Sequence, residues 1–226
     1  MKKEDLEMKY ENAYKGVSKI FSAQILRLLA GIFGVISAVF AVFTLASAMA
    51  GSLGGTAGFG IGTIVLLVLI AVFSIIAFIL MLVGTGNAGK DEPFFKTALL
   101  WLMIGIIASI ASSCLSTFPV GASIFKIIAT VADILSTFYI ISGIVSLADK
   151  IGNTDVSAKG NLLMKMIIAV YVIAIIIEII SLITKLAVAG AVIAGILGII
   201  AAVLSVVSYI LFLVLLSRAK KMLANA

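Results

Sequence analysis

The sequence predicts an all-α polytopic membrane protein, and three observations support this prediction. Of the 226 residues, 63% are hydrophobic and only 12% are charged, whereas soluble domains average roughly 45–50% apolar and about 25% charged residues. The mean hydropathy is +1.34. Two long stretches, 28–89 and 186–217, contain no charged residue. The composition excludes a soluble globular fold, and it excludes intrinsic disorder, which requires low hydrophobicity and high charge.

Polar or glycine-rich segments divide the apolar sequence into helices of spanning length, which is about 20 residues. We expect loops at 84–92, 117–121 and 149–161, and we expect Pro93 in the first turn of the helix that follows the first of these. The glycine-rich segment 51–62 favours a flexible outer turn, with a short re-entrant loop lining a pore as the alternative. The six predicted spans are approximately 28–50, 62–83, 93–116, 123–147, 162–185 and 188–216.

These spans form one transmembrane domain, 28–217, between two cytoplasmic segments. Segment 1–27 has an apolar stripe that includes Tyr10, Tyr14, Val17 and Phe21, interspersed with Lys and Glu. We expect it to form an interfacial amphipathic helix that lies on the inner leaflet before turning into the first span. Docking of a lipid or a partner is the alternative role for this stripe. Residues 218–226 are expected to form a short basic tail.

The distribution of basic residues predicts the orientation. With the N-terminus inside, every Lys and Arg except Lys126 and Lys185 lies on the cytoplasmic side, as the positive-inside rule requires. Because the number of spans is even, the C-terminus is also inside. The Ile-rich, His-free composition favours the cell (cytoplasmic) membrane of a bacterium.

A weak internal similarity suggests three repeated helix hairpins within the bundle. The dipeptide Gly86-Asn87 recurs as Gly152-Asn153 near the ends of the second and fourth spans, and the sixth span ends in a loosely similar segment. Repeated hairpins would be related by an axis along the membrane normal. Since apolar helices resemble one another by composition alone, a bundle without repeats stays open.

Residue counts argue against an enzyme. The chain has no histidine and a single cysteine, Cys114, so Ser-His and Cys-His pairs, His-ligated metals and thiolate clusters are excluded. We expect no cofactor and no metal. The net charge of +6 comes from residues that flank apolar spans, which indicates topology rather than nucleic-acid binding.

One segment is similar to a phosphate-binding loop. Residues 84–91, GTGNAGKD, nearly match the pattern G-x-x-x-x-G-K-[ST], but Asp91 replaces the hydroxyl residue that would hold magnesium. The motif also requires a preceding strand, whereas we expect two membrane helices around this segment. We therefore interpret it as an ordinary turn, with Asp91 and Glu92 placed favourably at the N-terminus of the following helix.

Four charged residues inside the spans form the candidate site: Asp133, Glu178, Lys126 and Lys185. Acids within spans cost at least ~2.5 kcal/mol on insertion scales, so they are functional candidates. Each acid lies seven residues from its lysine, about 10 Å along a helix axis. A fold-back at 155–156 would put Asp133 opposite Glu178 and Lys126 opposite Lys185. The acids, pointing into the bundle or into the hairpin seam, would then share a proton or hold a cation, or each would pair with a lysine and fix the helix register.

Small residues recur at every fourth position on two spans, at 30/34/38, 187/191/195 and 194/198/202. Such faces allow close helix packing in lipid. We therefore expect a non-enzymatic accessory or partner-binding subunit, surrounded by the lipid bilayer, that acts through helix packing, including self-association. The alternative is a transporter or channel for a proton, cation or small solute that uses Asp133 and Glu178.

Overall fold

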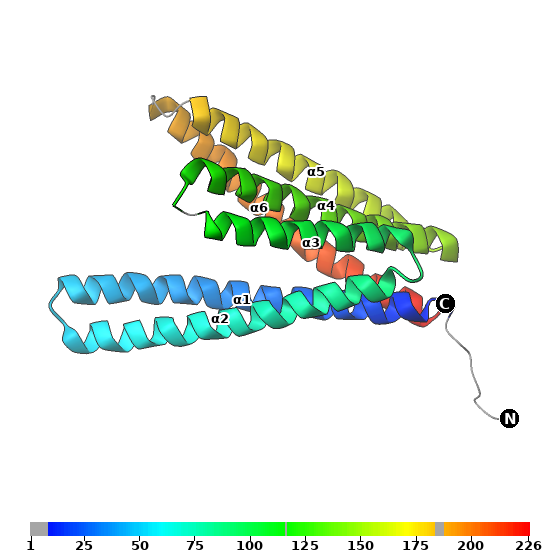
Figure 1. Cartoon of the computed structure of the whole chain (residues 1–226), viewed down its shortest axis with the longest axis horizontal. Coiled ribbons are helices and arrows are strands. Elements are labelled where there is room, and N and C mark those ends of the chain that lie inside the picture. Colours follow the sequence, from blue (N-terminus) through cyan, green and yellow to red (C-terminus); the bar gives the residue numbers. More distant parts are fainter. Residues whose placement is uncertain (1–8, 116, 184–187) are drawn as a thin grey trace. The chain divides into compact units, whose positions relative to one another are not determined.

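In the part of the chain that it describes, a computed structural model contains six long helices (Figure 1). It describes the backbone of residues 9–115, 117–183 and 188–226, and within these the side chains other than those of 53, 119–120, 123, 174–183, 188–199 and 201. The helices are α1 (Glu11–Met49), α2 (Leu53–Ala88), α3 (Pro93–Cys114), α4 (Pro119–Ile151), α5 (Thr154–Ile183) and α6 (Val188–Ala224). Each is long and apolar enough to cross a membrane, which confirms the predicted class of a multi-span helical membrane protein.

The chain forms two compact units. The first comprises residues 1–17 and 85–226, and the second comprises residues 18–84. The second unit is a hairpin of the long parts of α1 and α2. Aromatic rings join its two helices, with Phe33 stacked on Phe73 and Phe43 stacked on Phe59 at centroid distances of 5.7 and 5.4 Å.

The glycine-rich segment 51–62 is helical from Leu53 onward, so our expectation of a flexible turn over its whole length was wrong. The turn between α1 and α2 is confined to residues 50–52, where Gly51 has φ +70°. In lipid the backbone must satisfy its own hydrogen bonds, which favours a helix even where glycine is frequent. A Cβ at Gly62 would lie 2.8 Å from the Phe40 ring. The glycine therefore allows α2 to approach α1 closely.

The first helix continues from the N-terminal segment into the first span without the turn that we expected. Residues 17–30 contain no Gly or Pro that would break it. In the part of α1 that belongs to the first unit, Ala13 and Gly16 are buried together with Val17 of the expected stripe, whereas Tyr10 and Tyr14 of that stripe are half-exposed. The side of α1 that packs against protein is thus the side with small residues, which permit close approach.

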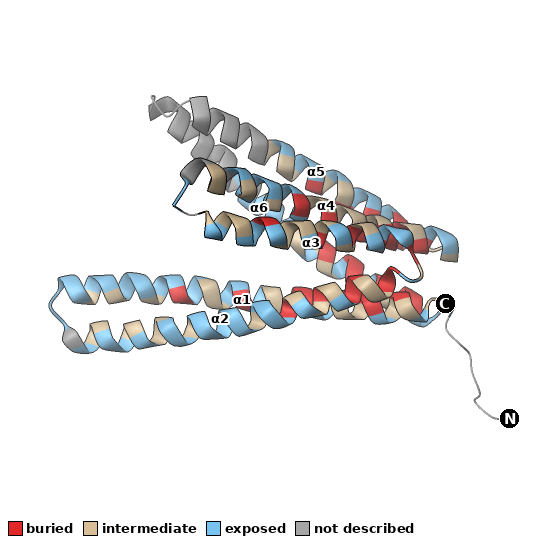
Figure 2. Cartoon of the chain, viewed as in Figure 1, coloured by how far each residue is buried: buried red, intermediate tan, exposed pale blue. Residues whose placement is uncertain are grey.

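The first unit is built around α4. The C-terminal half of α4 is the most buried part of this helix (Figure 2). Its buried residues include Ile140, Ile141, Ile144, Leu147 and Ala148. Glycines again mark the helix contacts. A Cβ at Gly143 of α4 would lie 2.6 Å from the ring of Phe95 on α3, and one at Gly160 of α5 would overlap Val145 of α4.

The connection between α4 and α5 is much shorter than the predicted loop 149–161. It consists of Gly152 and Asn153, because Gly152 adopts φ +79° and ends α4. Asn153 then accepts a hydrogen bond at Oδ1 from the backbone N–H of Val156 at 3.1 Å, as an N-cap does. The basic segment 218–226, which we expected to be a short tail, is the end of α6. The helix extends to Ala224, and Ala219 and Leu223 are buried.

We predict that Gly143→Ala destabilises the protein by about 1–3 kcal/mol, because the added methyl group overlaps Phe95 and the packed helices have little room to shift. Gly58→Ala is the matched control. A Cβ at Gly58 meets nothing within 4 Å, so this change should be neutral or stabilising by up to ~1 kcal/mol. Thermal unfolding in detergent, followed by circular dichroism, measures both. Equal effects of the two substitutions would contradict the packing role of Gly143.

Candidate functional site

The structure describes two of the four charged residues of the predicted site. Asp133 and Lys126 both lie on α4, and both side chains are exposed. Glu178 belongs to α5, but its side chain is outside the described part, and Lys185 is outside the described residues altogether. The predicted contact of the two acids therefore stays a prediction.

The short turn changes the expected register of the α4–α5 hairpin. The fold-back is centred on residues 152–153 rather than on 155–156. Across this turn, Tyr171 of α5 lies within electrostatic range of the Asp133 carboxylate. Tyr171 is thus an ionisable neighbour of Asp133 among the residues whose side chains the structure describes.

The side chain of Asp133 is exposed, whereas we expected it to point into the bundle or into the seam of the α4–α5 hairpin. The adjacent Ala132 and the next-turn Ser136 are fully buried and mark the side of α4 that packs inward. One residue along a helix is a rotation of 100°, so Asp133 lies outside this packed side. The backbone carbonyl of Asp133 accepts hydrogen bonds from Ser136 and Thr137, and no described basic group forms an ion pair with its carboxylate.

A buried charged pair lies elsewhere, at the turn between α2 and α3. The side chain of Glu92 is only 3% exposed, and its Oε2 accepts hydrogen bonds from Lys150 Nζ at 2.6 Å and from Ser146 Oγ at 3.0 Å. Lys150 is in the last turn of α4, with its side chain 46% exposed. This pair therefore connects the start of α3 to the end of α4 across 58 residues of sequence.

The neighbouring Asp91 caps a different helix from the one that we expected. Its carboxylate accepts hydrogen bonds from the backbone N–H of Ala13 at 2.7 Å and from Asn12 Nδ2 at 3.1 Å. Ala13 is in the first turn of α1, whose free N–H groups and positive dipole end favour a carboxylate. Neither acid forms a side-chain cap on α3: Glu92 occupies the N-cap position in an extended conformation, and Pro93 begins the helix.

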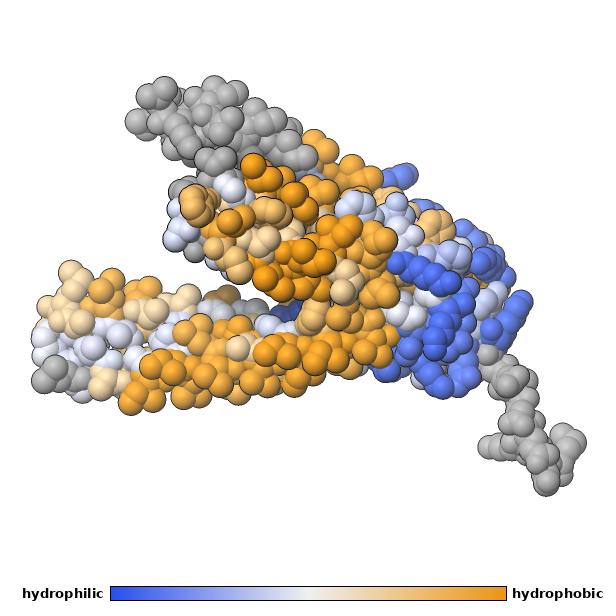
Figure 3. Space-filling model, viewed as in Figure 1, coloured by the Kyte–Doolittle hydropathy of each residue, from blue (hydrophilic) through white to orange (hydrophobic). Residues whose placement is uncertain are grey.

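A third polar contact closes the same end of the first unit. Asp155, in the first turn of α5, binds Lys159 and Arg218 at 2.5 Å each. Figure 3 shows hydrophilic side chains gathered around the α2–α3 and α4–α5 turns, whereas the helix surfaces away from these turns are apolar. All three contacts are therefore at one polar end of the unit.

The similarity to a phosphate-binding loop does not extend to the structure. Residues 84–88 are the last turn and a half of α2, and α3 follows after a four-residue turn, so the required strand is absent from this described segment. The Asp91 carboxylate is engaged with α1. Gly89 is close to α3, because a Cβ there would lie 3.0 Å from Lys96 Cγ. Gly89 therefore allows the α2–α3 turn to lie close to α3.

What the described residues can do chemically is limited. Among them, no group of three or more His, Cys, Asp or Glu side chains could hold a metal ion. Cys114 is exposed at the end of α3. Charged side chains in these residues bind one another, cap helices or face outward.

Local sequence gave little indication of the Glu92–Lys150 contact. The segment KDEP identified a turn, but a carboxylate before a helix-starting proline does not reveal which distant cation it binds. One general signal was present: Lys150 is in the last turn of an apolar helix, two residues before the αL Gly152. A cation at this position favours a polar neighbour without identifying it.

Comparison with known proteins gives no match to a family model, a curated protein or a solved structure. The length and apolar composition of the six helices in the described part of the chain define a multi-span helical membrane protein.

We predict that Glu92→Gln lowers the free energy of unfolding by about 1–3 kcal/mol, because the substitution removes the charge that binds Lys150 in a buried position. Glu11→Gln is the matched control: it breaks the ion pair of Glu11 with Lys15, whose side chains are 51% and 57% exposed. Exposed pairs of this kind contribute at most about 0.5 kcal/mol. Thermal unfolding in detergent compares the two variants, and a loss for Glu11→Gln as large as that for Glu92→Gln would refute the argument from burial.

Proposed function

We propose that the protein is a non-enzymatic membrane subunit that acts by packing the small-residue side of α1 against a helix of a partner. The observation that carries this proposal is the lack of a neighbour at this side within the hairpin unit. A Cβ built at Gly31 or at Gly34 would meet nothing within 4 Å, and Ala38 and Ala41 are exposed.

The position of this surface on α1 supports the proposal. Phe33 and Phe40 contact Phe73 and Phe59 of α2 and identify the side of α1 that is already occupied. Gly34 is one residue, or 100°, beyond Phe33 around the helix. The small residues therefore form a strip beside the hairpin contact, which we call the α1 strip and define as Gly31, Gly34, Ala38 and Ala41.

Physical chemistry favours a helix over lipid as the occupant of the α1 strip. Inside a bilayer there is no hydrophobic force between helices, so association depends on close van der Waals contact and on interhelical hydrogen bonds. A strip of Gly and Ala lets two backbones approach closely. Either another protein or a second copy of this chain fits this requirement.

Transport is the second candidate, and one observation favours it. Asp133 is a carboxylate within a spanning segment for which the described residues supply no ion pair. An unpaired intramembrane acid is costly and therefore a candidate for proton or cation binding. Under this alternative, purified protein in liposomes would conduct a proton or cation, and Asp133→Asn would abolish the flux.

We predict that a photo-crosslinking amino acid at Ala38 captures a helix of another polypeptide in native membranes, which mass spectrometry then identifies. To test a substitution at Ala38 itself, the photo-crosslinking amino acid is moved to Ala41. Ala38→Leu should then reduce the crosslink yield several-fold, because the larger side chain separates the backbones. Ala71→Leu, at an exposed alanine of α2, is the matched control and should leave the yield unchanged.

Three results would contradict the proposal: crosslinks only to lipid, crosslinks only within the same chain, or equal losses for the two leucine variants. Cation flux through liposomes that contain this chain alone, if lost in Asp133→Asn, would favour transport instead.

We also propose that both termini are cytoplasmic and that the protein lies in the cell membrane of a bacterium. The support is the charge distribution: the turns at 89–92 and 152–153 are close to basic residues, whereas the turn at 50–52 has none near it.

In a Cys114→Ala background, Ser52→Cys should react with an impermeant maleimide added to intact cells. Lys90→Cys should react only after permeabilisation. Both parent residues are exposed, so accessibility within the fold does not decide the result. Labelling of Lys90→Cys from outside would reverse the orientation.

A further inference from the structure

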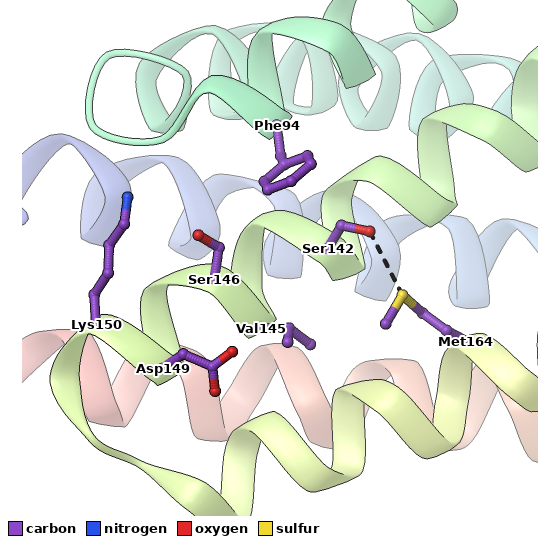
Figure 4. A pocket seen from close by; sticks show the side chains of 7 residues that line it. All are labelled: Phe94, Ser142, Val145, Ser146, Asp149, Lys150 and Met164. Carbon is purple, nitrogen blue, oxygen red and sulfur yellow. Dashed lines mark hydrogen bonds between the residues drawn. The ribbon is translucent and has the colours of Figure 1, made fainter.

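An open hollow of about 420 Å³ lies between the start of α3, the end of α4 and α5 (Figure 4). This volume is within the range of roughly 300–1,000 Å³ that small-molecule sites occupy. All of its lining residues belong to the first unit. The polar lining consists of Ser142, Ser146, Asp149 and Lys150 on α4, and the apolar lining consists of Phe94, Val145 and Met164.

The hollow changes from charged to apolar along α4. Asp149 and Lys150 occupy the last turn of the helix, and Ser146 is one turn before them. Ser142 lies eight residues before Lys150, about 12 Å along the axis, and its hydroxyl contacts the sulfur of Met164 at 3.5 Å. Figure 4 shows this contact at the end of the hollow opposite Lys150. The charged end is at the polar end of the unit, and the other end reaches into the spanning region.

The charged side chains of the hollow present a net negative charge to a ligand. Lys150 is neutralised by Glu92, but it has three N–H donors, so donors remain after the bond to Glu92. The carboxylate of Asp149 is exposed, and no basic group in the described part of the chain forms an ion pair with it. An occupant would therefore bring a cation to Asp149 and an acceptor to Lys150.

We propose that this hollow binds a phospholipid with a primary-amine headgroup, such as phosphatidylethanolamine. The ammonium group binds the Asp149 carboxylate, and the phosphate accepts a hydrogen bond from Lys150. The upper part of an acyl chain contacts Phe94, Val145 and Met164. The order of charges and apolar surface in the hollow matches the order of groups in such a lipid.

Other lipid headgroups fit this chemistry less well. An anionic phospholipid without an amine brings a second negative charge close to Asp149, which is unfavourable. A choline headgroup carries the positive charge but has no N–H group to donate to the carboxylate. The hollow should therefore prefer ethanolamine to choline, and choline to glycerol headgroups.

The test is native mass spectrometry of the purified full chain, equilibrated with equal amounts of phosphatidylethanolamine, phosphatidylcholine and phosphatidylglycerol of identical acyl chains. We expect retention of the ethanolamine lipid about two- to fivefold above the others, the range that one partly exposed charge pair supplies. Asp149→Asn should remove this preference. Met164→Trp keeps every charge but fills the apolar end, and should lower retention of the ethanolamine lipid.

Asp133→Asn is the matched control, since it is the same change at another exposed aspartate of α4, about 24 Å along the helix, and it should leave retention unchanged. Equal retention of the three lipids by the native chain would overturn the proposal. A preference that survives Asp149→Asn, or one that Asp133→Asn also removes, would overturn it as well. Unchanged retention of the ethanolamine lipid in Met164→Trp would do the same. Circular dichroism of each variant confirms that the helices are intact.

Discussion

The buried carboxylate of Glu92 is the constraint on which the packing of the first unit depends. A carboxylate with 3% exposure is stable there only because Lys150 and Ser146 bind it, since an uncompensated charge in such a position is expensive. The two donors belong to the end of α4, so the requirement of one side chain fixes where the start of α3 must lie. Phe95, three residues beyond Glu92, can then reach Gly143, and the same end of α4 forms one wall of the hollow at Asp149 and Lys150.

The second general constraint is the hydrogen bonding of the backbone in lipid. It explains why connections are short and why segments with poor helix propensity are nevertheless helical. The α4–α5 turn needs only Gly152 and Asn153, because an αL glycine ends one helix and an asparagine begins the next. Glycine has a second use within the helices, where Gly62, Gly143 and Gly160 each leave room for a side chain of the neighbouring helix. At these three positions glycine therefore serves close packing rather than flexibility.

Much of the architecture could be predicted from the sequence, because long apolar segments have few alternatives to spanning helices. The turn before Pro93 was also predictable, since its polar residues and proline act locally. The errors arose where tertiary contact outweighs local preference. Segment 51–62 favours a turn by propensity, but it is helical from Leu53 onward, and Gly55 and Gly62 lie close to Ser47 and Phe40 of α1. Asp133 was identifiable as an acid in an apolar span, yet its exposure depends on which side of α4 packs inward. The partners of Asp91 and Glu92 could not be predicted, because they lie 78 and 58 residues away in the chain.

The cap on α1 has a consequence for biogenesis. A helix normally begins with a capping residue of its own, which is present as soon as the segment leaves the ribosome. Here the carboxylate that serves Ala13 belongs to Asp91, so α1 and α2 are both synthesised before the cap exists. Until the α2–α3 turn has emerged, the backbone N–H of Ala13 therefore lacks the acceptor that it has in the folded chain. A nascent chain that ends after α2 would contain both hairpin helices but would lack the group that fixes the N-terminal end of α1.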